Sequence, residues 1–268
     1  MKKWMTFVII VSSIFLCSCG KKEAPGTLEF PGTAWEMSIR EVMDALNLEE
    51  KDIGYTYVDP YGINSKLYME GYKLFGAKTK FVDFQFMDFE NMMEREISEE
   101  WMENQDLLDQ AQDGINERFL DLTDHHELIE VLVNYPRDTD MEAVLNEMRN
   151  KYGEALSEIT MYEFNKSSPM NIPQPVEYKE SEQVKFWGSD FVGSCIPKKE
   201  SEAYRQKWKK YQVAPGIVDG ENGITWDIFL ETAHMHTILF QRESYQLIFL
   251  GQNAGIYRTL QRQISGDP

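Results

Sequence analysis

Two cysteines near the N-terminus have a spacing that could do chemistry. Cys17 and Cys19 are one residue apart and follow an uncharged apolar run, which itself follows Lys2 and Lys3. A C-x-C pair could bind a metal ion, but further Cys or His ligands would have to follow nearby, and none do. A basic start, a short apolar run and a small-residue exit instead predict a secretory signal peptide over residues 1–18, because that run is too short to cross a bilayer.

A pair of histidines near the C-terminus is the second constellation. His234 and His236 have i, i+2 spacing, so on a strand both imidazoles would point the same way. A metal site needs further ligands, and the sequence cannot show whether Glu231 or the pair His125-His126 comes close. We therefore predict no metal site and no cofactor. His234 and His236 remain the alternative ligands, and we expect them on the solvent face of a strand.

Two further patterns suggest activities that the sequence does not support. Gly193-Ser194-Cys195 could hold a hydrolase nucleophile, but its surroundings match no hydrolase signature. Calcium loops that start at Asp109 or Asp138 lack required residues, so the acidic run from Glu94 to Glu117 is interpreted as a solvated helical face. We predict that the protein is not an enzyme. A hydrolase that uses Cys195 or the histidine pair stays an alternative.

The elements that would position these residues alternate between helices and short strands. A capping box at Ser38 and a second at Thr139 to Glu142 predict two helices, and an acidic helix is expected over about residues 98–113. A further helix is expected over residues 201–212. Strands are expected at residues 55–58, 66–75, 80–89, 127–135, 184–187, 224–231, 235–241 and 245–250. This order predicts an α+β fold with antiparallel sheet and a few amphipathic helices, and two similar halves are an open alternative.

The chain divides into five expected segments. Residues 1–18 form the cleaved signal peptide, and residues 19–27 form a polar, lipidated tether. Residues 28–165 form an α+β region, residues 166–182 form a loop that holds Pro169, Pro173 and Pro175, and residues 183–268 complete the fold with a helix and antiparallel strands.

Charge excludes one class of partner. The chain carries a formal charge of −18, and loss of Lys2 and Lys3 with the signal peptide would leave −18 − 2 = −20. Nucleic acid is therefore not an expected partner, because phosphates require a basic surface. A basic cluster at Lys198, Lys199, Arg205, Lys207, Lys209 and Lys210 is expected to be solvated or to pair with the protein's own carboxylates.

The segment Leu16-Cys17-Ser18-Cys19 resembles a bacterial lipobox. The resemblance implies cleavage before Cys19, lipidation of Cys19 and attachment to a membrane of the bacterial cell envelope on its extracytoplasmic side. Cys195 would then be the one unmodified thiol, so no intramolecular disulfide is expected. Trp35 to Phe89 also resembles, at fold level, BamE-like lipoproteins and β-lactamase-inhibitor-like domains, where the face of the sheet binds another protein. Glu36 stands where glycine is common in such domains.

These expectations combine into one function. We predict a membrane-anchored, extracytoplasmic lipoprotein that acts as a non-catalytic binding or envelope-associated module, with a possible protein partner and no nucleic acid. The alternative is a solute-binding lipoprotein of a transporter. A deep cleft with convergent polar groups would favour the alternative, whereas an exposed aromatic sheet face would favour a protein partner.

Overall fold

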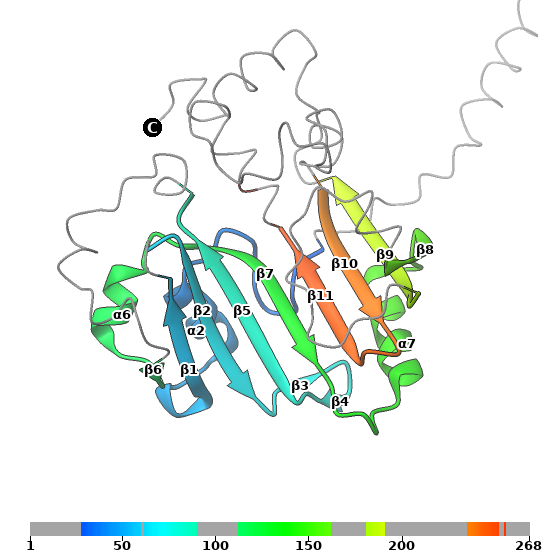
Figure 1. Ribbon diagram of the computed structural model, residues 1–268, viewed down its shortest axis with the longest axis horizontal. Coiled ribbons are helices and arrows are strands. Elements are labelled where there is room, and N and C mark those ends of the chain that lie inside the picture. Colours follow the sequence, from blue (N-terminus) through cyan, green and yellow to red (C-terminus); the bar gives the residue numbers. More distant parts are fainter. Residues whose placement is uncertain are drawn as a thin grey trace, which may run out of the picture.

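The protein is built on a nine-stranded antiparallel sheet (Figure 1). The computed structural model describes residues 28–59, 62–89, 112–161, 181–190, 235–251 and 255. The strand order is β6-β1-β2-β5-β7-β11-β10-β9-β8, and every neighbouring pair is antiparallel. The predicted α+β class is confirmed. The strands are β1 (Ile53–Val58), β2 (Asn64–Glu70), β5 (Phe81–Met87), β6 (Gln112–Asp113), β7 (Glu127–Asn134), β8 (Ser157–Thr160), β9 (Gln183–Asp190), β10 (Met235–Gln241) and β11 (Gln246–Leu250).

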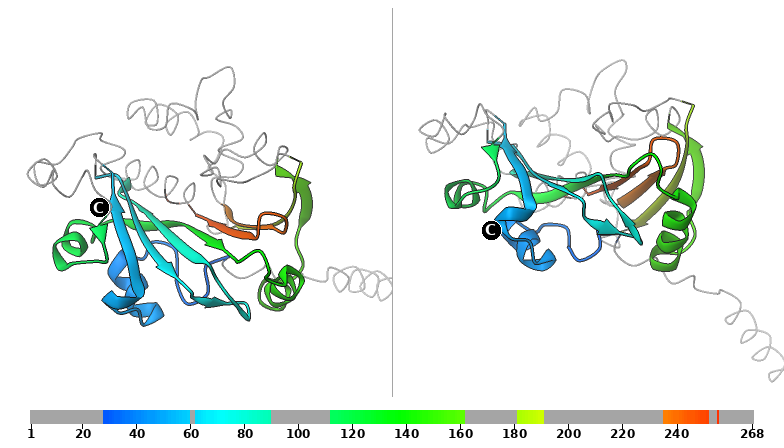
Figure 2. Two further views of the ribbon diagram at one scale, coloured as in Figure 1. Left: turned by 60° about the horizontal axis from the view of Figure 1, so that its bottom comes forward. Right: turned by 90° about the horizontal axis from the view of Figure 1, so that it is seen from below.

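The main core lies on one face of this sheet, which we call the inner face. Helices α2 (Ile39–Leu46) and α7 (Met141–Tyr152) lie on the same side of the sheet (Figure 2). Val82, Phe84 and Phe86 of β5 point towards them and are fully buried. Because strand side chains alternate, Asp83 and Gln85 point to the opposite face, which we call the outer face.

Helix α2 forms where its capping box predicts. The Ser38 hydroxyl accepts from the Glu41 amide at 3.4 Å, and the Glu41 carboxylate accepts from the Ser38 amide at 2.8 Å. These two bonds satisfy two amides that have no partner in the first turn. The helix ends at Asn47, whose left-handed conformation (φ 52°) lets its amide bond back to the last turn. The predicted start of this helix is confirmed.

Helix α7 begins one residue later than its predicted capping box implies. The N-cap is Asp140 rather than Thr139, and its carboxylate accepts from the amides of Glu142 and Ala143 at 3.1 and 3.2 Å. A carboxylate that receives two amide hydrogens also complements the positive end of the helix dipole, which favours Asp140 over a hydroxyl.

One predicted strand is two strands in the structure. The run over residues 66–75 is interrupted at Gly71, which has φ 67°, so β2 ends at Glu70 and β3 (Lys73–Leu74) starts a separate hairpin with β4 (Ala77–Lys78). Phe75 and Gly76 form the tight turn of that hairpin. Both have positive φ, 48° and 78°, which is the backbone that a two-residue hairpin turn favours.

Several short elements were not predicted. Helix α6 (Glu117–Leu122), strands β6 and β8, and the 3-10 turn η1 (Glu50–Asp52) have too few residues for a clear periodicity. The sequence places Asp113 at the end of an acidic helix. In the structure Asp113 lies in β6 and pairs with Tyr55 of β1. Strand β9 extends the expected 184–187 run to Gln183–Asp190.

The strand order is symmetric about the centre of the sheet. Helix α2 precedes β1, β2, β5 and β7, and helix α7 precedes β8, β9, β10 and β11. The last long strand of each set, β7 and β11, pair with each other at the middle. We call these sets the N-terminal half and the C-terminal half. Among the described residues, no helix is long and apolar enough to span a membrane.

Candidate functional site

Most residues that the sequence marks as chemical lie outside the described part of the chain. These are Cys17, Cys19, Cys195, His234, Glu231, the 166–180 part of the proline-containing loop, the basic cluster, and residues 98–111 of the expected acidic helix. The structure therefore places neither the lipidation site nor the Gly-Ser-Cys segment. The site is built from the sheet and from two other histidines.

His236 does not lie on a solvent face, and that expectation is wrong. Its side chain is 3 % exposed and its ring centroid lies 5.2 Å from that of Trp35. The segment 28–37, which precedes α2, covers this part of the sheet. Gly251 packs so closely on Trp35 that a Cβ atom there would lie 2.6 Å from the indole. His236 is therefore a core residue within the described structure.

The outer face of the N-terminal half carries aromatic and polar side chains. The rings of Tyr55, Tyr68 and Phe81 stack across β1, β2 and β5, with centroid separations of 4.5 and 5.4 Å. All three side chains are half-buried. Tyr57 and Lys66 are cross-strand partners in the next row and are also half-buried. We call Tyr55, Tyr57, Lys66, Tyr68 and Phe81 the aromatic patch.

Two buried carboxyl groups lie beside the aromatic patch. Glu130 of β7 is 3 % exposed and accepts a hydrogen bond from the Gln85 amide at 3.0 Å. Burial, and then the charge of Asp83, raise the pKa of Glu130 to about 8. Asp83 lies 3.6 Å from the Lys66 ammonium, but burial outweighs that contact and raises the pKa of Asp83. Buried carboxyl groups with raised pKa values are commoner at functional sites than elsewhere.

The same face of the C-terminal half carries an apolar cluster, with the buried polar side chains of Thr237, Gln241 and Gln246 beside it. Val184, Leu239, Ile248 and Leu250 form a second cluster with Met161, and all five are at most 2 % exposed. Leu132 of β7 and Phe186 of β9 pack against this cluster and are half-buried. The two halves therefore differ on the outer face, because half-buried aromatic rings lie on the N-terminal half and a fully buried apolar cluster lies on the C-terminal half.

Asp88, His125 and His126 form the only group of potential metal ligands found in the described part of the chain. Asp88 follows β5 and the histidines precede β7, and the pairing of Met87 with Glu127 brings these strand ends together. One ligand atom from each residue lies within 4.8 Å of the others. Burial, and then the neighbouring His125, lower the pKa of His126 to about 3, so its imidazole is neutral.

The Ser65 hydroxyl beside this cluster is not placed to act as a catalytic nucleophile. The Ser65 hydroxyl lies 2.8 Å from His126 Nδ1, which is hydrogen-bond distance for a serine and its base. Ser65 and His126 are both 0 % exposed, so a substrate carbonyl cannot reach the hydroxyl. The contact orients the His126 ring instead.

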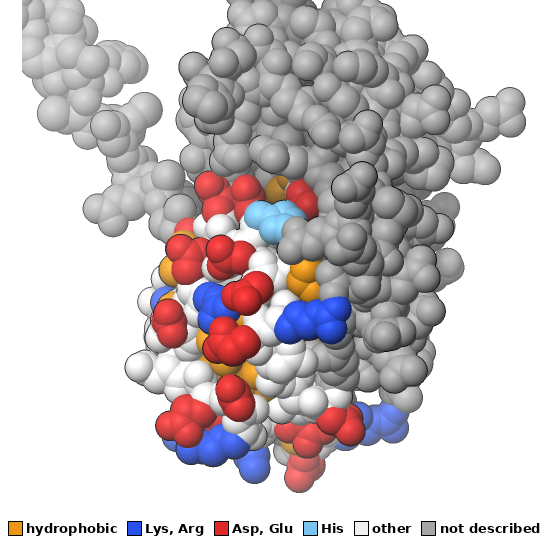
Figure 3. Space-filling model, turned by 90° about the vertical axis from the view of Figure 1, so that its left-hand side faces the viewer, with side chains coloured by type: hydrophobic (Ala, Val, Ile, Leu, Met, Phe, Trp, Pro, Cys, Tyr) orange, Lys and Arg blue, Asp and Glu red, His pale blue; other side chains and the backbone are white. Residues whose placement is uncertain are grey.

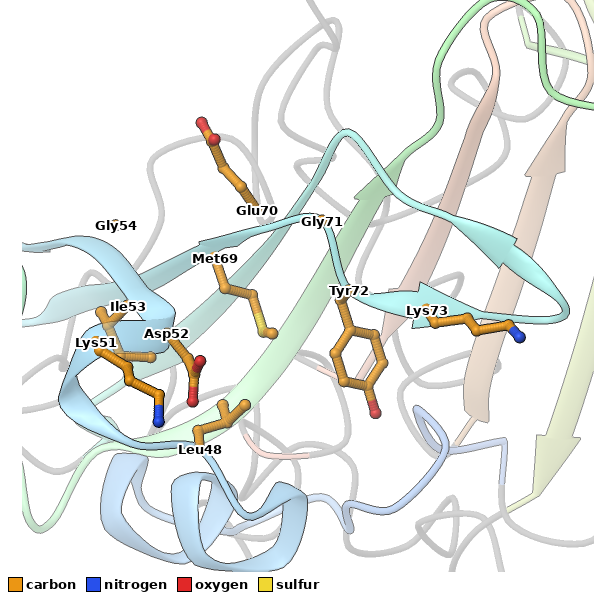
Figure 4. Close-up of a pocket in the computed structure, with 10 residues that line it drawn as sticks. All are labelled: Leu48, Lys51, Asp52, Ile53, Gly54, Met69, Glu70, Gly71, Tyr72 and Lys73. Atoms are coloured by element: carbon orange, nitrogen blue, oxygen red, sulfur yellow. The ribbon is translucent and has the colours of Figure 1, made fainter.

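A hollow of about 550 Å³ lies between η1 and the turn after β2 (Figure 4). Leu48, Met69 and Tyr72 point into the same space, whereas the Glu70 side chain points away from them. The charged lining residues Lys51, Asp52 and Lys73 are exposed, and Lys51 already pairs with Glu49. No buried charged group lines the hollow, so it lacks the fixed polar contacts of a specific solute site.

The surface beside α6 is acidic. Figure 3 shows carboxylates scattered across the described part of this face, among fewer lysine and arginine side chains. Arg40 bridges Glu117 and Asp121 at 2.8 and 2.7 Å, so part of the positive charge is already paired. A face of this kind attracts cations rather than phosphates.

Comparison of the chain with protein-family models, with curated proteins and with solved structures gave no match.

Sequence reasoning missed the two buried carboxyl groups and the placement of Asp88 beside His125 and His126. The signal for Glu130 is weak but present, because this acidic residue interrupts the apolar run Leu128 to Val133 of a predicted strand. No local signal joins Asp88 to His125, since 36 residues separate them in the sequence. Only the register of β5 and β7 brings them together.

Proposed function

We propose that the protein is a lipid-anchored, extracytoplasmic binding module that uses the aromatic patch to hold a protein partner. The observation that carries the proposal is the patch itself: stacked, half-buried aromatic rings on a sheet face beside a lysine and two carboxyl groups. Tyrosines with a polar rim are typical of the energetic centre of protein interfaces. The fold-level resemblance to sheet-binding lipoprotein domains supports the same assignment.

The anchor is part of the proposal. A lipobox at Leu16 to Cys19 would hold the module at the bacterial envelope, where a partner in the same membrane is met at high local concentration. Replacing Cys19 by alanine should leave an uncleaved precursor without acyl chains, and mass spectrometry of the intact chain reads both changes at once. An acylated Cys19→Ala chain would exclude the anchor.

Crosslinking followed by affinity capture from the protein's own cells tests the partner. The wild-type chain should capture a defined protein, and Tyr68→Ala should lose it because the central ring of the stack is removed. Glu147→Ala is the matched control, since Glu147 is an exposed residue of α7 on the other side of the sheet. Both variants should melt within a few degrees of wild type.

The outcomes separate binding through the aromatic patch from binding through the helical side of the sheet. Equal capture by wild type and Tyr68→Ala would contradict binding through the aromatic patch, whatever protein is recovered. Loss of capture with Glu147→Ala but not with Tyr68→Ala would place the interface on the helical side. The absence of any captured protein would overturn the partner proposal.

A further inference from the structure

The cluster Asp88, His125 and His126 has the ligand types of a transition-metal site. Two imidazoles and one carboxylate form the set that binds zinc and similar divalent ions in open, three-ligand centres. Hard cations such as calcium and magnesium prefer sites made of oxygen alone. The chemistry of the donor set therefore favours zinc over the alkaline-earth ions.

The spacing of the donors is close to what such an ion requires. His125 Nε2 lies 3.0 Å from Asp88 Oδ2, and the three donors lie within 4.8 Å of one another. Bonds of about 2.1 Å in a tetrahedral centre place donors about 3.4 Å apart. The side chain of His125 is 53 % exposed, so its ring can make the small movement that closes the set.

The cluster is held by the fold on both sides. The Asp88 amide donates to the Ile63 carbonyl at 2.8 Å, and the His126 amide donates to the Thr123 carbonyl at 3.0 Å. The Ser65 hydroxyl contacts His126 Nδ1 at 2.8 Å and fixes the orientation of that ring. Outer contacts of this kind pre-organise a metal ligand and strengthen its affinity.

Access and charge also suit a cation. Asp88 and His126 are buried, whereas His125 reaches the surface, so an ion can enter from one side. The chain carries a net charge of −18, which raises the local concentration of cations. An ion pair between Asp88 and His125 would explain why these two residues lie together. It would not explain why a donor atom of His126 lies beside them.

We propose that Asp88, His125 and His126 bind one divalent transition-metal ion, with zinc as the occupant that fits best. The site leaves at least one coordination position for water or for a donor from another molecule. It is independent of the aromatic patch, so either proposal can fail without the other.

Isothermal titration of the metal-stripped full chain with zinc sulfate tests the site. Wild type should bind one zinc ion, and magnesium or calcium at the same concentration should give no heat. His125→Gln should weaken zinc binding at least about tenfold, because a direct ligand is lost. This variant changes an exposed side chain, so it should still fold. Asp88→Asn should weaken binding in the same direction.

His234→Gln is the matched control, because His234 belongs to the pair that the sequence offers as alternative metal ligands. It should bind zinc as wild type does. Cobalt added in place of zinc should give visible absorption bands in wild type and His234→Gln that His125→Gln lacks. Equal affinity of wild type and His125→Gln would overturn the proposal, and so would a loss with His234→Gln alone.

Discussion

Glu130 is the residue whose environment departs most from what its side chain prefers. It lies on the central strand β7, and its partners on the same face include the Gln85 amide and the neighbouring Asp83 and Lys66. Burial dominates these charges and raises the pKa to about 8. A neutral Glu130 is thus the form that the fold stabilises, and its ionisation opposes folding.

The raised pKa of Glu130 predicts a specific pH dependence of stability. In the unfolded chain the carboxyl ionises near its ordinary value of 4.5, whereas in the folded chain it keeps its proton up to about pH 8. The unfolded state therefore binds fewer protons between these values, so the free energy of unfolding falls as the pH rises through that window. Glu130→Gln keeps an acceptor for Gln85 and removes this slope.

We expect Glu130→Gln to be more stable than wild type at pH 8 by about 2 kcal/mol or more, and similar to wild type at pH 4.5. Urea unfolding at both pH values measures the difference. Glu147→Gln removes the same charge from an exposed position of α7 and should change stability little at either pH. A Glu130→Gln chain that is less stable at pH 8 would show that Lys66 stabilises an ionised Glu130 instead.

Residue-level features were predicted where they depend on local backbone and missed where they depend on distant packing. Glu36 has a positive φ of 76°, a backbone that disfavours a side chain, at a position where the resemblance noted in the sequence led us to expect glycine. The solvent-exposed placement of His236 was wrong. The alternation of its strand gives the direction of a side chain but not what covers it, and Trp35 lies 201 residues earlier in the chain.

The elements themselves are specified mainly by caps, turns and alternation. Helix α2 was predicted from its capping box, β5 from its period-two pattern, and β1, β7, β10 and β11 from runs of apolar, aromatic and β-branched residues. Helix α6 was missed because its six residues span less than two turns, although Asn116 caps it by accepting from the Phe119 amide at 2.9 Å. Short elements depend on tertiary contacts more than on propensity.

The N-cap of α7 gives a sharp prediction at this scale. Asp140→Ala should lower the free energy of unfolding by about 1 kcal/mol, because two amides of the first turn lose their acceptor. Thr139→Ala should change it by less than about 0.5 kcal/mol, since the structure, unlike the sequence pattern, does not use its side chain as the cap. Thermal and urea unfolding of both variants provide the comparison. A larger loss of stability with Thr139→Ala than with Asp140→Ala would show that Thr139 is the N-cap, as the sequence pattern predicts.

At the scale of the whole molecule, the mirrored strand order has a consequence for stability. The main core includes Ile53, Leu67 and Phe84 from the N-terminal half and Trp187, Ile238 and Phe249 from the C-terminal half. The expectation of two similar halves remains a prediction, and their outer faces differ in chemistry, with half-buried aromatic rings on the N-terminal half and a buried apolar cluster on the C-terminal half. Whatever their origin, the halves share one sheet and one core.

Particular contacts tie the two halves together. Phe249 of β11 packs edge-on against Phe30, with ring centroids 5.6 Å apart, and against Tyr152 of α7 at 6.3 Å. The Tyr152 hydroxyl donates to the Glu29 carbonyl at 2.7 Å, and its ring meets Phe75 of the β3–β4 hairpin at 6.1 Å. A substitution at Phe249 should therefore lower the stability of strands that Phe249 does not contact.

We expect the described strands to open in a single cooperative unit, and Phe249→Leu tests this. The variant should lower the free energy of opening by about 1–2 kcal/mol, read by hydrogen exchange of the backbone amides. The loss should be equal in β2 and β5 of the N-terminal half and in β10 and β11, because the shared core must break before either half opens. Leu156→Ala, at a side chain that is 60 % exposed, should leave all four strands unchanged. A loss confined to β10 and β11 would mean that the halves unfold separately despite their common sheet.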